Sequence, residues 1–170
     1  MEKTDWTAFD AVWNRVSGAS AESPAVPAGK KVSPPRKEAE DTARLRLFLE
    51  ETAAAERAYR AITARTSLRW LQELCGKLRQ QETVHKRRLQ SAYFLLTGDT
   101  CPLREVPGAQ APLLEMLRSR LLCERASAGA YREAARAADS MELSRLFTEL
   151  AGEEARHGEL LHAAVTRLLS

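Results

Sequence analysis

The stretch that decides the fold is residues 124–157, ERASAGAYREAARAADSMELSRLFTELAGEEARH. Ala, Leu, Arg and Glu dominate it, and these residues have high helix propensity. A short junction at Asp139 and Ser140 divides the stretch into two runs, and Ser140 stands where the second run needs an N-cap. The stretch therefore predicts two helices joined as an antiparallel hairpin.

Apolar residues keep the helical period from Asp41 to the end of the chain. Ser67 stands at a predicted N-cap and Gly98 at a predicted C-terminal stop. The junction after the first helix is short, like the one after the third. The predicted fold class is an all-α four-helix bundle of two repeated helical hairpins, with helices at about 41–65, 67–97, 112–138 and 140–169.

The connection between the two hairpins is longer, at residues 98–111. About 14 residues at roughly 3.3 Å each could run the length of a helix. A crossover of this kind would make the second and third helices parallel. A plain up-down-up-down bundle stays open as the alternative.

The composition of the chain excludes several classes of protein. With 170 residues, 44% of them hydrophobic, it can bury a core. A net charge of +3 is too small for a nucleic-acid footprint, and no apolar run approaches a membrane span. Three cysteines without a C-x-x-C pair favour free thiols. We therefore expect a cytoplasmic protein with no nucleic-acid or membrane partner.

Residues 1–40 differ from the rest of the chain and form a separate predicted domain ahead of the bundle at 41–170. Its apolar residues predict a short amphipathic helix, and a Pro/Ser-rich linker follows through Pro35. This helix is interpreted as an anchor that docks on the bundle or on a second copy, or as a partner-binding peptide. The apolar residues are Trp6, Phe9, Val12, Trp13 and Val16.

The two predicted hairpins repeat each other in sequence. A shift of 72 residues places Tyr59 on Tyr131 and lays Glu82-x-x-His85 on Glu154-x-x-His157. A Glu-x-x-His motif that recurs at one distance after a tyrosine is hard to produce by chance. The hairpins therefore look like a duplication.

Five charged or ionisable side chains fall inside the apolar stripes of three helices, where burial costs several kcal/mol unless they are paired or bound to a metal. Glu and His three residues apart can grip one divalent ion, so two such motifs can hold two ions. This arrangement is the one found in di-iron and di-manganese bundles. Two iron ions are the predicted cofactor, with manganese as the alternative. The five are Glu82, His85, Glu124, Glu154 and His157.

Residues 124–135 and 142–157 resemble the second hairpin of the ferritin-like superfamily, and of its rubrerythrin-type di-iron four-helix bundles in particular. The first hairpin resembles it less, and the similarity covers about 41–170. The resemblance implies a di-iron centre that reacts with O2 or peroxide and a homodimeric bundle. The cysteine-ligated iron domain of rubrerythrins is not recognisable here, so an external electron donor is expected. The implied ligands are Glu82, His85, Glu124, Glu154 and His157.

The first hairpin departs from this pattern at Thr52, which the repeat aligns with Glu124. A hydroxyl is a poor substitute for a bridging carboxylate. Helical side chains lean toward the N-terminus, so Glu56 is the predicted substitute metal ligand. Tyr59 and Tyr131 are expected beside the site, with hydroxyls that hydrogen-bond its carboxylates.

Two functional hypotheses follow. The first is a di-metal oxidoreductase or peroxide scavenger without an assigned catalytic residue. The alternative is a non-catalytic helical bundle that acts as an interaction module and keeps a degenerate metal site. The basic run 86–88 is interpreted as a solvated face.

Overall fold

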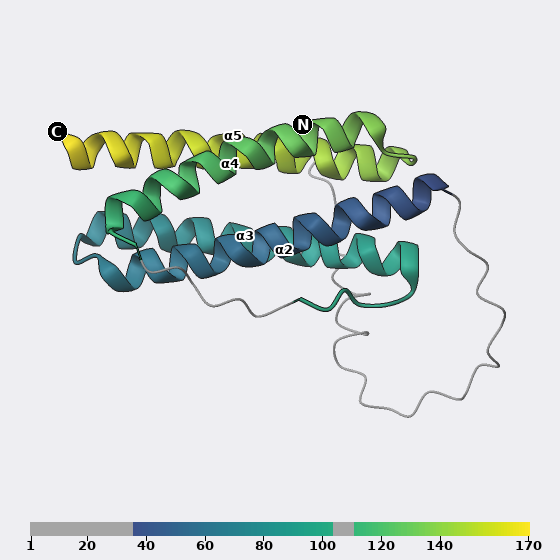
Figure 1. The fold of residues 1–170 in the computed structure, drawn as a ribbon, viewed down its shortest axis with the longest axis horizontal. Helices are drawn as coiled ribbons and strands as arrows, with labels where there is room; N and C mark the ends of the chain where they lie inside the picture. The colour runs from purple at the N-terminus through teal and green to yellow at the C-terminus, as the bar shows by residue number, and fades with distance from the viewer. Residues whose placement is uncertain (1–35, 104–110) are drawn as a thin grey trace, which may run out of the picture. The chain divides into compact units, whose positions relative to one another are not determined.

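The computed structural model describes residues 36–103 and 111–170. These residues form an all-α bundle and contain no strand, as the sequence predicts (Figure 1). None of the described helices is both long enough and apolar enough to cross a membrane. The predicted amphipathic helix and its linker lie outside the described residues. The four helices are α2 (Arg36–Arg65), α3 (Arg69–Thr97), α4 (Leu113–Ala137) and α5 (Met141–Leu169).

The helices pair as two hairpins, α2 with α3 and α4 with α5, and α2 also packs beside α4. At one end of the bundle Arg65 donates a hydrogen bond to the carbonyl of Ala111, at 2.6 Å. At the other end the amide of Asp139 donates to Asp41 Oδ2, at 3.0 Å. These contacts make α2 and α4 antiparallel. Helix α3 therefore ends at the opposite end of the bundle from the start of α4, and these two helices run parallel, which excludes the up-down-up-down alternative (Figure 1).

Two of the three predicted caps are confirmed, Ser140 at the start of α5 and Gly98 at the end of α3. The Ser140 side chain accepts a hydrogen bond from the Leu143 amide at 3.1 Å, and Gly98 adopts the left-handed region at φ 73°. The prediction of Ser67 as the N-cap of α3 was wrong by one residue. Leu68 occupies the N-cap, and its amide donates to the Thr66 hydroxyl at 3.1 Å. Helix α2 begins at Arg36 rather than Asp41, because no helix-breaking residue follows the proline-rich segment.

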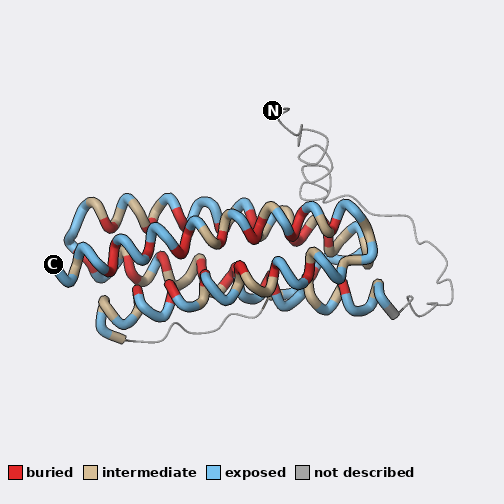
Figure 2. Tube along the Cα trace, turned by 90° about the horizontal axis from the view of Figure 1, so that it is seen from above, coloured by how far each residue is buried: buried red, intermediate tan, exposed pale blue. Residues whose placement is uncertain are grey.

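The buried residues lie on the inner sides of the helices (Figure 2) and form two apolar clusters along the bundle. One cluster contains Phe48, Tyr131 and Phe147, and the other contains Ile62 and Leu117. Each helix contributes to both. The positions between the clusters on α3, α4 and α5 are the charged residues that the sequence places inside the core, so the fold itself carries them to the centre.

Leu89 tests this packing, because its side chain is fully buried in the first cluster. Leu89→Ala should lower the free energy of unfolding by about 2–5 kcal/mol through lost burial and a residual cavity. Leu95→Ala on the same helix is the matched control, since Leu95 is 69% exposed, and should change stability by less than about 0.5 kcal/mol. Urea denaturation measures both. Equal losses would contradict the assigned core.

Candidate metal centre

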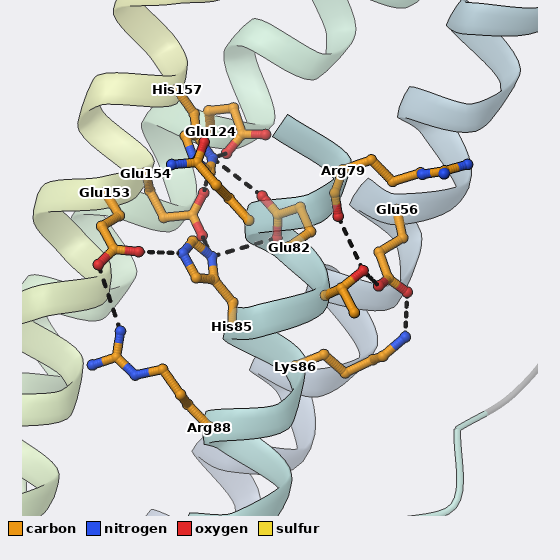
Figure 3. A network of polar contacts seen from close by, with 12 residues as sticks. Glu56, Arg79, Glu82, His85, Lys86, Arg88, Glu124, Glu153, Glu154 and His157 are labelled. Carbon is orange, nitrogen blue, oxygen red and sulfur yellow. Dashed lines mark hydrogen bonds and ion pairs between the residues drawn. The ribbon is translucent and has the colours of Figure 1, made fainter. Parts of the chain in front are cut away.

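The five predicted ligands converge in the middle of the bundle (Figure 3). On α3 and α5 the Glu and His lie one turn apart on a face that leucines occupy before and after them, so the helix faces the core there. Their exposed fractions are 1% for Glu82, 0% for His85, 0% for Glu124, 3% for Glu154 and 1% for His157.

Four of these side chains form a tight group that could hold a metal ion. One ligand atom from each lies within 4.8 Å of the others, in the set Glu82, Glu124, Glu154 and His157. His157 Nδ1 lies 3.2 Å from Glu82 Oε1 and 3.7 Å from Glu124 Oε2. Its other ring nitrogen, Nε2, lies 3.1 Å from Gln81 Oε1.

His85 adjoins this group from the opposite side. Its Nδ1 lies 3.1 Å from Glu154 Oε1, and its Nε2 lies 2.5 Å from Glu153 Oε2. The rings of His85 and His157 are stacked, with centroids 5.4 Å apart. In both histidines Nδ1 faces the carboxylates, while Nε2 is held by the residue just before the repeat-related glutamate. The sequence repeat is therefore also a repeat of geometry.

The two tyrosines have different partners. The Tyr59 hydroxyl donates to Glu124 Oε1, as expected for a tyrosine beside a site carboxylate. The Tyr131 hydroxyl instead lies beside Thr52, the repeat equivalent of Glu124. Arg120 also contacts the carboxylate that Tyr59 contacts, with its Nε 2.9 Å from Glu124 Oε1. The second tyrosine thus contacts a hydroxyl because α2 supplies no carboxylate there.

Glu56, the predicted substitute ligand, lies outside the group. Its carboxylate accepts a hydrogen bond from the Thr83 hydroxyl at 2.5 Å and pairs with Lys86. The ammonium of Lys86 holds this carboxylate at the interface of α2 and α3. The run 86–88 is therefore not a purely solvated face, and Arg88 reaches α5, where its Nη1 lies 3.5 Å from Glu153.

Protonation of the two histidines balances the negative charge of the carboxylates in the centre. Burial by itself lowers the pKa of His85, but the nearby carboxylates outweigh it and raise this pKa to about 11, and the same holds for His157. Burial alone raises the pKa of Glu154, and the two imidazoles outweigh it and lower this pKa to about 2. Burial raises the pKa of Glu124. Both imidazoles are therefore cations at neutral pH.

Sequence reasoning missed three residues of the centre. Arg120 is 6% exposed and precedes Glu124 by one helical turn. Gln81 and Glu153 hold the outer nitrogens of the two histidines. The 72-residue shift carries a signal for the last two, because it aligns them with each other. Arg120 has only its helical spacing from Glu124 as a signal.

Comparisons with known proteins identify the fold. No protein-family model and no curated protein matches the chain. The structure of a hypothetical protein from Pyrococcus furiosus is similar, with a TM-score of 0.69, 20% identity and coverage of 76% of this chain and 90% of that one. A conserved hypothetical protein from Mycobacterium tuberculosis has a TM-score of 0.66, 16% identity and coverage of 76% and 93%. At these identities the similarity shows a shared four-helix fold.

The two tyrosines give a matched pair of variants. Tyr59→Phe removes a hydrogen bond to the buried carboxyl group of Glu124 and should lower the free energy of unfolding by about 1–3 kcal/mol. Tyr131→Phe removes a hydroxyl that lies beside the neutral Thr52 and should cost at most about 0.5–1.5 kcal/mol. Chemical denaturation of the two metal-free variants measures the difference. A larger loss for Tyr131→Phe would contradict the assigned partners.

Proposed function

We propose that this bundle is a ferritin-like protein that binds iron or manganese at its buried centre and reacts there with O2 or peroxide. The observation that carries the proposal is the convergence of three carboxylates and an imidazole within 4.8 Å of one another. Isolated buried carboxylates are costly, and a divalent cation is the partner that several of them can share. The resemblance of the second hairpin to rubrerythrin-type bundles supports the same chemistry.

The donor set favours a transition metal. Carboxylate oxygens alone suit Mg²⁺ and Ca²⁺, whereas the imidazole nitrogen adds preference for iron, manganese or zinc. Cys75 is buried in the apolar cluster of Ile62 and Leu117, separate from the carboxylates. The group therefore offers oxygen and nitrogen ligands without a thiolate, which supports iron or manganese over an iron–sulfur cluster.

The protein's own residues would shape the reaction. Glu82, Glu124, Glu154 and His157 would hold the metal, which would supply the redox chemistry. The apolar clusters on both sides keep bulk water from the centre. Tyr59 holds a proton beside Glu124. Reduction of a peroxide to water takes a pair of electrons and a pair of protons, and the electrons would come from an external donor.

Thermal stability provides the test of metal binding. The metal-free full chain should gain roughly 5–10 °C in Tm with Mn²⁺ or anaerobic Fe²⁺ at about 100 times Kd, and much less with Mg²⁺. Glu154→Gln should abolish the gain, whereas Glu159→Gln, at an exposed position of the same helix, should keep it. The absence of any transition-metal effect would instead support the non-catalytic interaction module. Peroxide consumption with an added reductant then tests the reaction.

Thr52 offers a gain-of-function test. Thr52→Glu adds a buried carboxylate and should cost about 3–5 kcal/mol of stability without metal, because Thr52 is 3% exposed. Mn²⁺ should stabilise this variant more than it stabilises the wild type, since the added carboxylate faces the centre. Thr52→Gln is the neutral control of equal length and should gain nothing extra. Calorimetric scans with and without Mn²⁺ compare the three proteins, and equal metal effects on all of them would contradict the prediction.

A further inference from the structure

Three buried polar atoms that lack a hydrogen bond gather around His157, and none of them belongs to its repeat equivalent, His85. Glu82 Oε1, Glu124 Oε2 and His157 Nδ1 are buried and make no hydrogen bond. Their side chains are at most 2% exposed. Buried polar atoms that face each other without a hydrogen bond are poorly satisfied, so three such atoms at one place mark a position that a shared cation could fill.

These atoms have the spacing that one metal ion requires. His157 Nδ1 lies 3.2 Å from Glu82 Oε1, 3.7 Å from Glu124 Oε2 and 3.6 Å from Glu154 Oε2 (Figure 3). Ligands bound at about 2.0–2.2 Å around one ion are roughly 3–3.6 Å apart. A single cation can therefore satisfy all three atoms with small shifts, and Glu154 completes its protein ligands.

The other half offers no such position. His85 is the repeat equivalent of His157, and its ring nitrogens likewise face polar partners, Nδ1 toward Glu154 and Nε2 toward Glu153. Thr52, however, stands where a second carboxylate would be needed, and a hydroxyl is a poor substitute for that ligand. This half therefore lacks a ligand that a second ion needs.

Glu124 is also unable to bridge two ions. A bridging carboxylate gives one oxygen to each ion, but Glu124 Oε1 accepts from Tyr59 and lies 2.9 Å from Arg120 Nε. The guanidinium is permanently charged, so it repels a second cation at this oxygen. The repeat equivalent of Arg120 is Phe48, whose ring packs 4.1 Å from the ring of Tyr131, centroid to centroid. The buried guanidinium of Arg120 therefore has no counterpart at the repeat-related position in α2.

We infer that the centre holds one metal ion, bound by Glu82, Glu124, Glu154 and His157, and not the two ions that the repeated motif predicts. The inference rests on the proposed metal binding and fixes its stoichiometry. His85 acts as a positioning residue, because it holds Glu154 Oε1 while Oε2 faces the ion.

Metal counting on the full-length wild type tests the inference directly. The metal-free protein is dialysed against excess Mn²⁺, and bound manganese is measured by elemental analysis together with its electron paramagnetic resonance spectrum. One equivalent with the spectrum of an isolated ion supports the inference. Two equivalents, or the spectrum of a coupled pair, would overturn it and leave the proposed metal binding intact. No bound manganese, with Fe²⁺ also unbound, would overturn both.

The repeat-related histidines supply a matched pair of variants. His157→Gln removes a ligand and should weaken Mn²⁺ binding by more than about 100-fold, whereas His85→Gln should keep one equivalent with at most a roughly 10–100-fold weaker affinity. Circular dichroism and thermal melting confirm that each variant folds. Equal loss of binding in both variants would overturn the assignment, and the wild-type count decides the question if either variant does not fold.

Discussion

Three glutamates lie at most 3% exposed between two clusters of leucine and aromatic side chains, so their negative charge must be neutralised from within the protein. In the metal-free chain the positive charge comes from the guanidinium of Arg120 and from the imidazoles of both histidines, which stay protonated because their pKa values are raised. A metal ion would replace protons at the same place. The bundle can keep these groups inside only because cations accompany them.

The arrangement of helices explains how one chain gathers these groups. The two hairpins pack with their Glu-x-x-His motifs facing each other, and the 72-residue repeat then becomes an approximate two-fold relation in space. Each histidine is held in the same way, at Nε2 by Gln81 or Glu153. Two-fold symmetry of this kind would give equal halves if the paired residues were equal.

The halves have diverged at the residues that matter most for a cation. Glu124 and Arg120 in α4 correspond to Thr52 and Phe48 in α2. One half thus has a carboxylate with a buried guanidinium, and the other has a hydroxyl beside an aromatic pair. In each half a tyrosine lies beside the corresponding residue, Tyr59 beside Glu124 and Tyr131 beside Thr52. Because Thr52 and Phe48 are neutral, α2 adds no buried charge at the two positions where α4 has Glu124 and Arg120.

The sequence by itself determined the helices, the duplication and the inward position of Glu82, His85, Glu124, Glu154 and His157, because helical periodicity depends only on local spacing. It left open whether the second and third helices run parallel, and it predicted Glu56 as a ligand. Only the tertiary structure decided these points. Lys86 and Thr83 hold Glu56 away from the centre, and Arg65 binds Ala111 at the far end of the bundle. Competition among partners on different helices depends on distances in space, which residue spacing along one helix does not contain.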